Sequence, residues 1–199
     1  MFQGMAIRHN QERQRSIYKT LYAKHRCSHR SLHWSDPVHQ WERFRILSQI
    51  GELKGRKILD IGCGLGDFFS YLQQERIHGH FVGFDIVEEF LSEARERHPK
   101  IRFEHCNVLS KPLTEKFDYV FASGVYAFGN RTFFQALTKE AFRLAKHGYA
   151  FNLYHSRYDR RFFRFSQEEI YTFCKSLEPR RIVVKKNYLD DDTTFFLYK

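Results

Sequence analysis

Short apolar runs alternate with amphipathic stretches from residue 57 to residue 154. The apolar runs have the length of single strands, whereas the amphipathic stretches repeat their apolar residues at every third or fourth position, as one face of a helix does. Such alternation predicts parallel strands joined by right-handed helical crossovers in an open α/β sheet. The expected strands are 57–61, 80–85, 101–106, 117–123 and 149–154, and the expected helices are 67–76, 87–97 and 131–146, the last stopped by Gly148.

The pattern changes in the last part of the chain. A helix is expected over 167–177, followed by two strand-like runs at 181–188 and 193–198. The link between these two runs is too short for a parallel crossover. The two strands are therefore expected to form an antiparallel hairpin at one side of the sheet.

The pattern of the first 55 residues predicts a separate helical segment. Residues 1–15 are polar and expected to fray, whereas 16–25 suit a short helix that begins after Ser16. Asp36 followed by Pro37 is typical of a helix start, and Gly51 of a helix end. We therefore divide the chain into a helical cap or lid, residues 1–55, and a main domain, residues 56–199.

Charge is concentrated at the N-terminal end. The chain has 199 residues and a formal net charge of +10, and residues 1–57 hold 12 Lys and Arg against 4 Asp and Glu. A basic segment of this kind suits an anionic partner such as RNA, or has no partner at all. The four cysteines form no C-x-x-C pair, so no metal site is expected. Without an apolar run long enough to span a membrane or a secretory signal, a soluble cytoplasmic protein is expected.

The strongest motif joins the first expected strand to the first crossover helix. Asp60 is followed by Gly62, Gly64 and Gly66, and then by Asp67. Alternating glycines let the backbone turn sharply and approach a ligand closely. The dinucleotide fingerprint requires a small residue where Asp67 stands, and a carboxylate there would repel a diphosphate. Asp60 suits instead a cationic group, such as the amino group of a methionine moiety.

A second carboxylate, Asp85, ends the next strand, where it suits a grip on ribose hydroxyls. The loop from Asp60 to Gly66, Asp85 and the C-terminal hairpin together resemble the class I S-adenosylmethionine-dependent methyltransferases over about residues 38–199. The resemblance implies a Rossmann-like seven-stranded sheet of order 3-2-1-4-5-7-6, with the last strand antiparallel and helices on both sides. It also implies S-adenosylmethionine as cofactor, with S-adenosylhomocysteine as product.

The resemblance further implies which residues hold that cofactor. Asp85 would hold the ribose, Ile86 would line the adenine, and Asn107 stands where the family often has an Asp that bonds the adenine amino group. Arg43 of the cap is a candidate for the cofactor carboxylate. The cofactor-binding residues are then Asp60, Gly62, Cys63, Gly64, Gly66, Asp67, Asp85, Ile86, Asn107, Val108, Ser123, Gly124 and Arg43.

Two residues are candidates for catalysis. His155 follows the fifth strand and could deprotonate a hydroxyl or amine, and Tyr126 follows the fourth strand and could orient the acceptor. Four arginines beyond His155 suit a carboxylate or phosphate of the acceptor, or single-stranded nucleic acid. They are Arg157, Arg160, Arg161 and Arg164.

The favoured activity is methyl transfer by in-line displacement to a small-molecule acceptor. An RNA or protein methyltransferase that uses the basic segment is the main alternative, although the length of the chain leaves no room for a separate RNA-binding domain. A cofactor-binding protein without catalysis is a further alternative, since a fold does not establish an activity. An NAD-dependent dehydrogenase is the least favoured. Oligomeric state is not readable from the sequence.

Overall fold

A seven-stranded mixed sheet of order β3-β2-β1-β4-β5-β7-β6 forms the centre of the molecule. The computed structural model describes residues 2–26, 28–32, 36–110, 112–154, 165–190 and 192–199. All pairings are parallel except those of β7, which runs antiparallel to both β5 and β6. The predicted sheet order and hairpin are confirmed. The strands are β1 Lys57–Ile61, β2 His80–Asp85, β3 Arg102–His105, β4 Phe117–Ala122, β5 Ala145–Tyr154, β6 Arg181–Lys185 and β7 Asp192–Tyr198.

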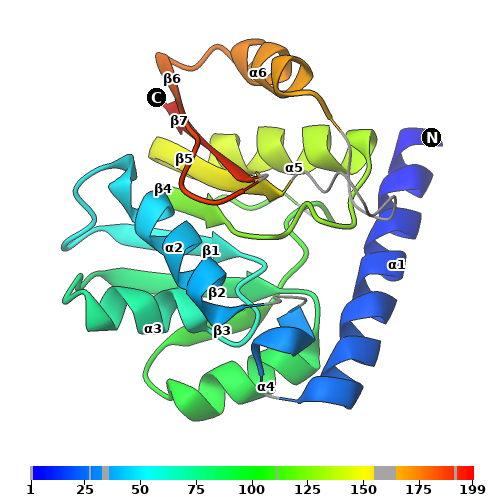
Figure 1. The fold of residues 1–199 in the computed structure, drawn as a ribbon. Helices are drawn as coiled ribbons and strands as arrows, with labels where there is room; N and C mark the ends of the chain where they lie inside the picture. Colours follow the sequence, from blue (N-terminus) through cyan, green and yellow to red (C-terminus); the bar gives the residue numbers. More distant parts are fainter. Residues whose placement is uncertain (1, 27, 33–35, 111, 155–164, 191) are drawn as a thin grey trace.

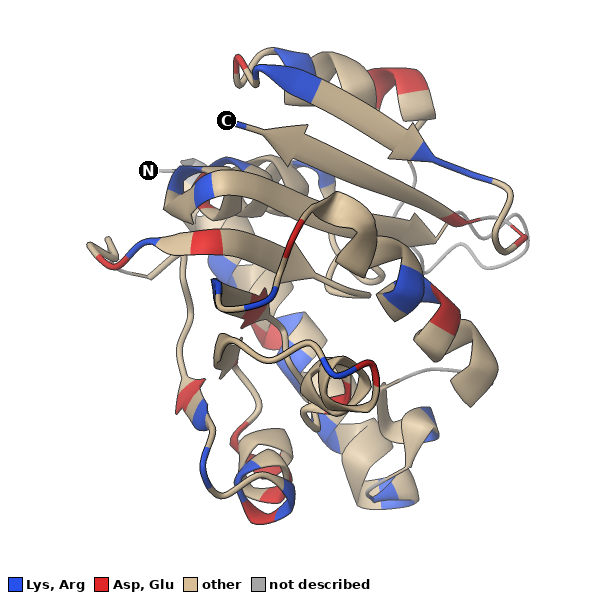
Figure 2. Cartoon of the chain, turned by 90° about the vertical axis from the view of Figure 1, so that its left-hand side faces the viewer, with Lys and Arg blue, Asp and Glu red and all other residues tan. Residues whose placement is uncertain are grey.

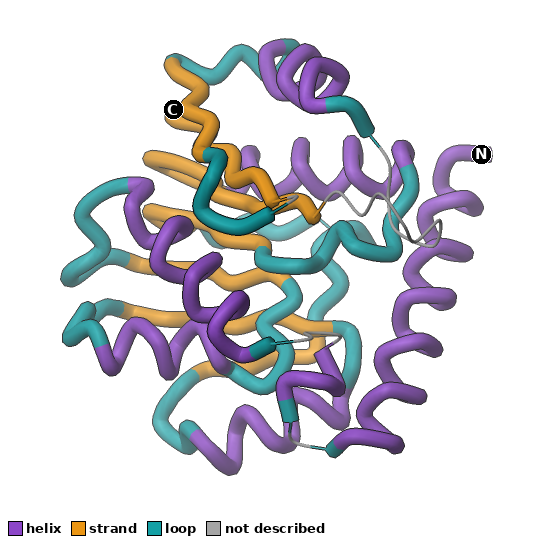
Figure 3. Tube along the Cα trace, in the orientation of Figure 1, coloured by secondary structure: helices purple, strands orange, loops and turns teal. Residues whose placement is uncertain are grey.

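Helices cover both faces of this sheet (Figure 3). Because successive strand residues point to opposite faces, β1 contributes Leu59 to one core and Ile58 to the other. The first core includes side chains of α5 (Arg131–Leu144) and α6 (Gln167–Lys175). The second includes side chains of α2 (Pro37–Leu47), η2 (Ser48–Ile50), α3 (Asp67–Gln74) and α4 (Glu88–Arg97).

Helix α1 (Phe2–His25) stands beside the sheet at the carboxyl ends of its central strands (Figure 1). Tyr18, Tyr22 and Leu32, the last from η1 (His29–Leu32), pack on a small third core around Phe90. The expectation that residues 1–15 fray and that the helix begins after Ser16 is wrong, because α1 begins at Phe2. Tertiary contacts hold its polar first half: Asn10 is buried and its amide donates to the Phe128 carbonyl at 3.3 Å.

Helix α2 begins as predicted, with Asp36 as N-cap. The Asp36 carboxylate accepts a hydrogen bond from the Val38 backbone at 2.8 Å, and Pro37 opens the helix. Phe44 and Leu47 lie in the same core as sheet residues such as Phe121. This helix therefore packs directly on the sheet, and the division of the chain at residue 55 stays a prediction.

Two other expected boundaries differ from the structure. Helix α5 ends at Leu144 and β5 begins at Ala145, so Gly148 lies inside a strand and does not stop the helix. A Cβ at Gly148 would lie 2.9 Å from Ile50 Cδ1, so this glycine permits close packing of η2 on the sheet. Strand β6 ends at Lys185, earlier than expected, and Asn187 has a left-handed backbone with φ 61°. The chain turns there before pairing with β7.

Charged side chains are spread over the elements. On the side of the molecule that Figure 2 shows, Lys and Arg are interspersed with Asp and Glu. Among the described helices, none has the length and apolar character needed to cross a membrane.

Candidate cofactor and acceptor site

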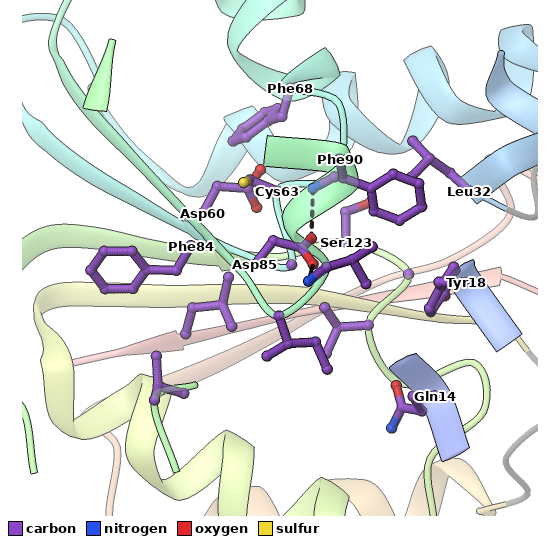
Figure 4. A pocket seen from close by; sticks show the side chains of 18 of the residues that line it. Gln14, Tyr18, Leu32, Asp60, Cys63, Phe68, Phe84, Asp85, Phe90 and Ser123 are labelled. Carbon is purple, nitrogen blue, oxygen red and sulfur yellow. Dashed lines mark hydrogen bonds between the residues drawn. The ribbon is translucent and has the colours of Figure 1, made fainter. Parts of the chain in front are cut away.

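A cavity lies where β1, β2 and β4 end, between the sheet edge and helix α1 (Figure 4). Its empty volume is about 940 Å³, part of it open to solvent. Open α/β sheets commonly bind small molecules at such edges. Of the predicted cofactor-binding residues, the structure brings to this cavity Asp60, Gly62, Cys63, Gly64, Asp67, Asp85, Ile86, Asn107, Val108, Ser123 and Gly124.

The glycine loop wraps around the end of β2. The Phe84 carbonyl accepts from the backbone N–H of Gly62 at 2.7 Å and from that of Cys63 at 3.1 Å, and the Gly64 N–H donates to Asp85 at 2.9 Å. Three consecutive amides of the loop are therefore already used within the protein. A diphosphate-binding loop would instead direct such donors at the ligand.

Asp85 holds the loop and faces the cavity. One carboxylate oxygen accepts from Gly64 and the other from the Val87 N–H at 2.9 Å. Burial raises the pKa of Asp85, and the backbone donors Gly64, Val87 and Ile86 oppose that rise. Each oxygen of an ionised carboxylate has a further acceptor position, so Asp85 can still accept hydrogen bonds from two hydroxyls.

Asp60 is the least satisfied polar group of the site. Its side chain is buried, with 2% of the residue exposed, and Oδ1 has no hydrogen-bond partner among the described residues. Burial, together with the negative charges of Asp85 and Asp67, raises the pKa of Asp60 to about 8. A buried acceptor of this kind is costly unless a donor satisfies it. The cavity therefore offers a cationic donor a favourable position beside Asp60.

Asp67 is bound by neighbours on both of its oxygens. Oδ1 accepts from Arg97 at 2.9 Å and Oδ2 accepts from Gln40 at 3.0 Å. Gly66, also predicted to bind cofactor, does not line the cavity; it precedes α3 in the left-handed conformation, φ 79°. Its role in the structure is to turn the backbone into α3.

Asn107 joins the cavity wall to helix α1. Its Oδ1 accepts from Gln11 Nε2 at 2.8 Å, and its Nδ2 donates to Gln11 Oε1 at 2.9 Å. The Leu109 backbone N–H also donates to Oδ1, at 3.0 Å. The amide predicted to face an adenine thus already has partners in the protein.

The turn after β4 is held by Asn152, which was not predicted from the sequence as a site residue. Asn152 of β5 is buried, and its carbonyl oxygen accepts from the Gly124 N–H at 3.0 Å. Its amide donates to Ser123 Oγ at 3.2 Å. Asn152 therefore positions both predicted residues of this turn from the neighbouring strand.

The structure does not bring Arg43 to the cavity. Arg43 is buried in an ion pair with Asp192, the first residue of β7, and Asp192 also accepts from the Tyr188 hydroxyl. The predicted contact with a cofactor carboxylate is corrected accordingly, because α2 directs this guanidinium toward the hairpin.

Tyr126 also lies away from the cavity. It is 1% exposed, and its hydroxyl is hydrogen-bonded to Thr138 at 2.8 Å and to Tyr149 at 2.6 Å within the core. Burial raises the pKa of Tyr126. The prediction that it orients an acceptor is corrected: it packs beneath the site. His155 and the arginines Arg157, Arg160, Arg161 and Arg164 lie outside the described residues.

Comparison with known proteins agrees with this geometry. Residues 58–148 match a family model described as a methyltransferase domain. Over 81 residues the chain is 33% identical to the trans-aconitate 2-methyltransferase of Afipia carboxidovorans, which covers 41% of this chain and 32% of that protein. These matches support the resemblance to the class I S-adenosylmethionine-dependent methyltransferases.

Further comparisons extend this likeness to other methyltransferases. The demethylmenaquinone methyltransferase of Lactococcus lactis is 26% identical over 145 residues, 70% of this chain and 56% of that protein. The structure of magnesium protoporphyrin IX methyltransferase from Synechocystis with bound S-adenosylhomocysteine has a TM-score of 0.68 at 14% identity, and covers 98% of this chain and 99% of that one. The match to that structure shows the shared fold. The chain spans about a third of the length of the trans-aconitate methyltransferases it matches.

Several residues of this chain line the cavity although the sequence analysis did not predict them. Gln11, Gln14 and Tyr18 of α1 all line it. Their spacing of three and four residues places them on one face of a helix. That spacing was the available signal, but polar residues on a helix face are usually solvated, so it did not indicate a ligand site. Leu32 and Gln40 were likewise missed, since no motif around them in the sequence indicates a ligand site.

The close approach of Gly62 to Val125 predicts a loss of stability when a larger residue replaces this glycine. Its φ is +75°, and an added Cβ would lie 2.1 Å from Val125 Cγ2. Gly55 has φ +72°, but an added Cβ there would meet no atom of the described residues within 4 Å beyond its chain neighbours. We expect Gly55→Ala to lower the free energy of unfolding by ~1–2 kcal/mol through its left-handed backbone. Gly62→Ala should cost a further ~1–3 kcal/mol through the clash. Urea unfolding measures both, and equal losses would show that Val125 moves aside freely.

Proposed function

We propose that the chain binds S-adenosylmethionine in this cavity and transfers its methyl group to a small-molecule acceptor. The observation that carries the proposal is the unsatisfied, buried oxygen of Asp60. A cofactor with an ammonium group would satisfy it, and a dinucleotide would bring only further negative charge toward Asp60, Asp67 and Asp85. The loop amides, used within the protein, likewise favour a ligand without a diphosphate.

The residues present fit this cofactor part by part. Asp60 would hold the amino group, Asp85 the ribose hydroxyls, and Asn107 the adenine edge, with Ile86 and Val108 beside the ring. When bound, S-adenosylmethionine supplies a methyl group on a sulfonium, which is already a strong electrophile. The task of the protein is then to orient the acceptor and exclude water.

The walls of the cavity favour a small acceptor. Helix α1 covers one side with Gln14 and Tyr18, and α2 adds Gln40 and Phe44. Aromatic rings at Phe90 and elsewhere line much of the remainder, so the space beside the cofactor is enclosed on several sides. The name of the Afipia relative specifies a small organic acceptor, which supports the same class here. His155 lies outside the described residues, and its role as general base stays a prediction.

Calorimetry tests the cofactor assignment directly. We expect S-adenosylhomocysteine to bind to the protein and NAD, at the same concentration, not to bind. Binding of NAD without binding of S-adenosylhomocysteine would overturn the proposal. Methyl transfer is then sought with radiolabelled S-adenosylmethionine and a fractionated extract of small metabolites. Suppose that the cofactor binds, that no small-metabolite fraction is methylated, and that an RNA or protein fraction is. This result would leave the cofactor assignment intact and reject the small acceptor.

A further inference from the structure

The amides of Gln11 and Asn107 form a reciprocal hydrogen-bonded pair at the cavity wall. Each side chain donates one hydrogen bond and accepts one, at 2.8 and 2.9 Å. The Leu109 backbone N–H donates to Asn107 Oδ1 at 3.0 Å, which sets the orientation of the Asn107 amide. Asn107 therefore presents a fixed acceptor and a fixed donor side by side, and Gln11 occupies both.

An adenine edge has the same hydrogen-bonding pattern as the Gln11 amide. It offers an amino donor beside a ring-nitrogen acceptor, and Asn side chains bind it through two hydrogen bonds. Gln11 and Asn107 both line the cavity that is assigned above to the cofactor. Resting on that proposed function, we propose that Gln11 competes with the adenine of S-adenosylmethionine for the Asn107 amide and so determines cofactor affinity.

Helix α1 is held independently of this pair. Tyr18 contacts Phe90 edge to face at 6.1 Å between ring centroids, and Lys19 forms an ion pair with Glu89 at 2.7 Å. Asn10 is hydrogen-bonded to the Phe128 carbonyl. These contacts lie on both sides of Gln11 along the helix. The Gln11 side chain can therefore leave Asn107 by rotation while the helix stays in place.

The test is calorimetric titration of the full chain and of the Gln11→Ala variant. S-adenosylhomocysteine is one ligand, and S-inosylhomocysteine, in which a carbonyl oxygen replaces the adenine amino group, is the other. Gln11→Ala should bind S-adenosylhomocysteine about three- to tenfold more tightly, as expected for removing one competing amide pair. The gain should be smaller for S-inosylhomocysteine, whose edge does not match the fixed Asn107 amide. Glu12→Ala, an exposed neighbour on the same helix, is the matched control.

Each outcome decides the proposal. A gain for S-adenosylhomocysteine that exceeds the gain for the inosine analogue, and that disappears when Asn107→Ala is added, supports it. Unchanged or weaker binding in Gln11→Ala overturns it and leaves the proposed function standing. An equal gain for both ligands also overturns it, because the effect would then come from a looser helix. If neither the wild type nor Gln11→Ala binds S-adenosylhomocysteine, the proposed function fails and this inference fails with it.

Discussion

Replacing Asp60 by Asn will weaken the binding of S-adenosylhomocysteine about 10- to 100-fold near pH 9. The change removes the negative charge that faces the ligand ammonium while keeping the size of the side chain. Hydrogen bonds to charged groups contribute ~1.5–3 kcal/mol, which corresponds to that range of affinity. Titration calorimetry measures the loss. Asp190→Asn, at an exposed position in the link between β6 and β7, is the control and should bind as the wild type does.

The same residue makes binding depend on pH. Burial first, and then Asp85 and Asp67, raise the pKa of Asp60 to about 8, so its carboxyl is protonated in the empty protein below that pH. An ammonium ligand requires the carboxylate, so binding must release the proton. The wild-type affinity should therefore fall by up to about tenfold for each pH unit below about 8. The Asn variant should lack this dependence, and a flat wild-type profile would contradict the role assigned to Asp60.

As pH rises, the free energy of unfolding should change in the opposite direction to the affinity for the ligand. The pKa of Asp60 is about 8 in the folded protein and near 3.8 when the group is free. Its bound proton thus stabilises the folded state fully below about pH 4, and this contribution is lost as pH rises through about 8. Between pH 6 and pH 9 the unfolding free energy of the wild type should fall by roughly 1–3 kcal/mol more than that of Asp60→Asn. Urea unfolding without ligand at the two pH values measures the difference.

Replacing Arg43 by Met will destabilise the protein by about 3–5 kcal/mol. Arg43 and Asp192 are both buried, and removal of one partner of a buried ion pair leaves the other charge uncompensated. The matched control is Arg45→Met on the same helix. Arg45 pairs with Glu42 at the surface, and an exposed pair contributes ~0–1 kcal/mol.

The pH dependence distinguishes a lost charge partner from lost packing. Burial raises the pKa of Asp192, and Arg43 opposes that rise. Without Arg43 the pKa of Asp192 should rise further, so protonation removes the unpaired charge at a higher pH. The destabilisation by Arg43→Met should therefore be smaller near pH 5 than near pH 8. A loss that is the same at both pH values would assign the effect to packing alone.

The order of elements could be predicted because it depends on local patterns. Strand β2 was predicted with its exact bounds, since a short apolar run ends in the carboxylate Asp85. The glycine loop after Asp60 was equally readable, because only glycine combines a left-handed backbone with the close approach found at Gly62. The sheet order came from a family resemblance carried by these same residues. Boundaries such as the start of β5 were missed, because pairing with β4 extends that strand past Gly148.

The sequence by itself determined the fold class, the loop at Asp60 and the carboxylate at Asp85, since each depends on residues close together in the chain. Only the tertiary structure decided where Arg43 and Tyr126 point and which residue lies against Asn107. Arg43 and Asp192 are 149 positions apart, and Gln11 and Asn107 are 96 apart. Hydrophobic periodicity reports which face of an element is buried, but not which distant polar group it meets. Those partners are chosen when helices α1 and α2 pack against the sheet.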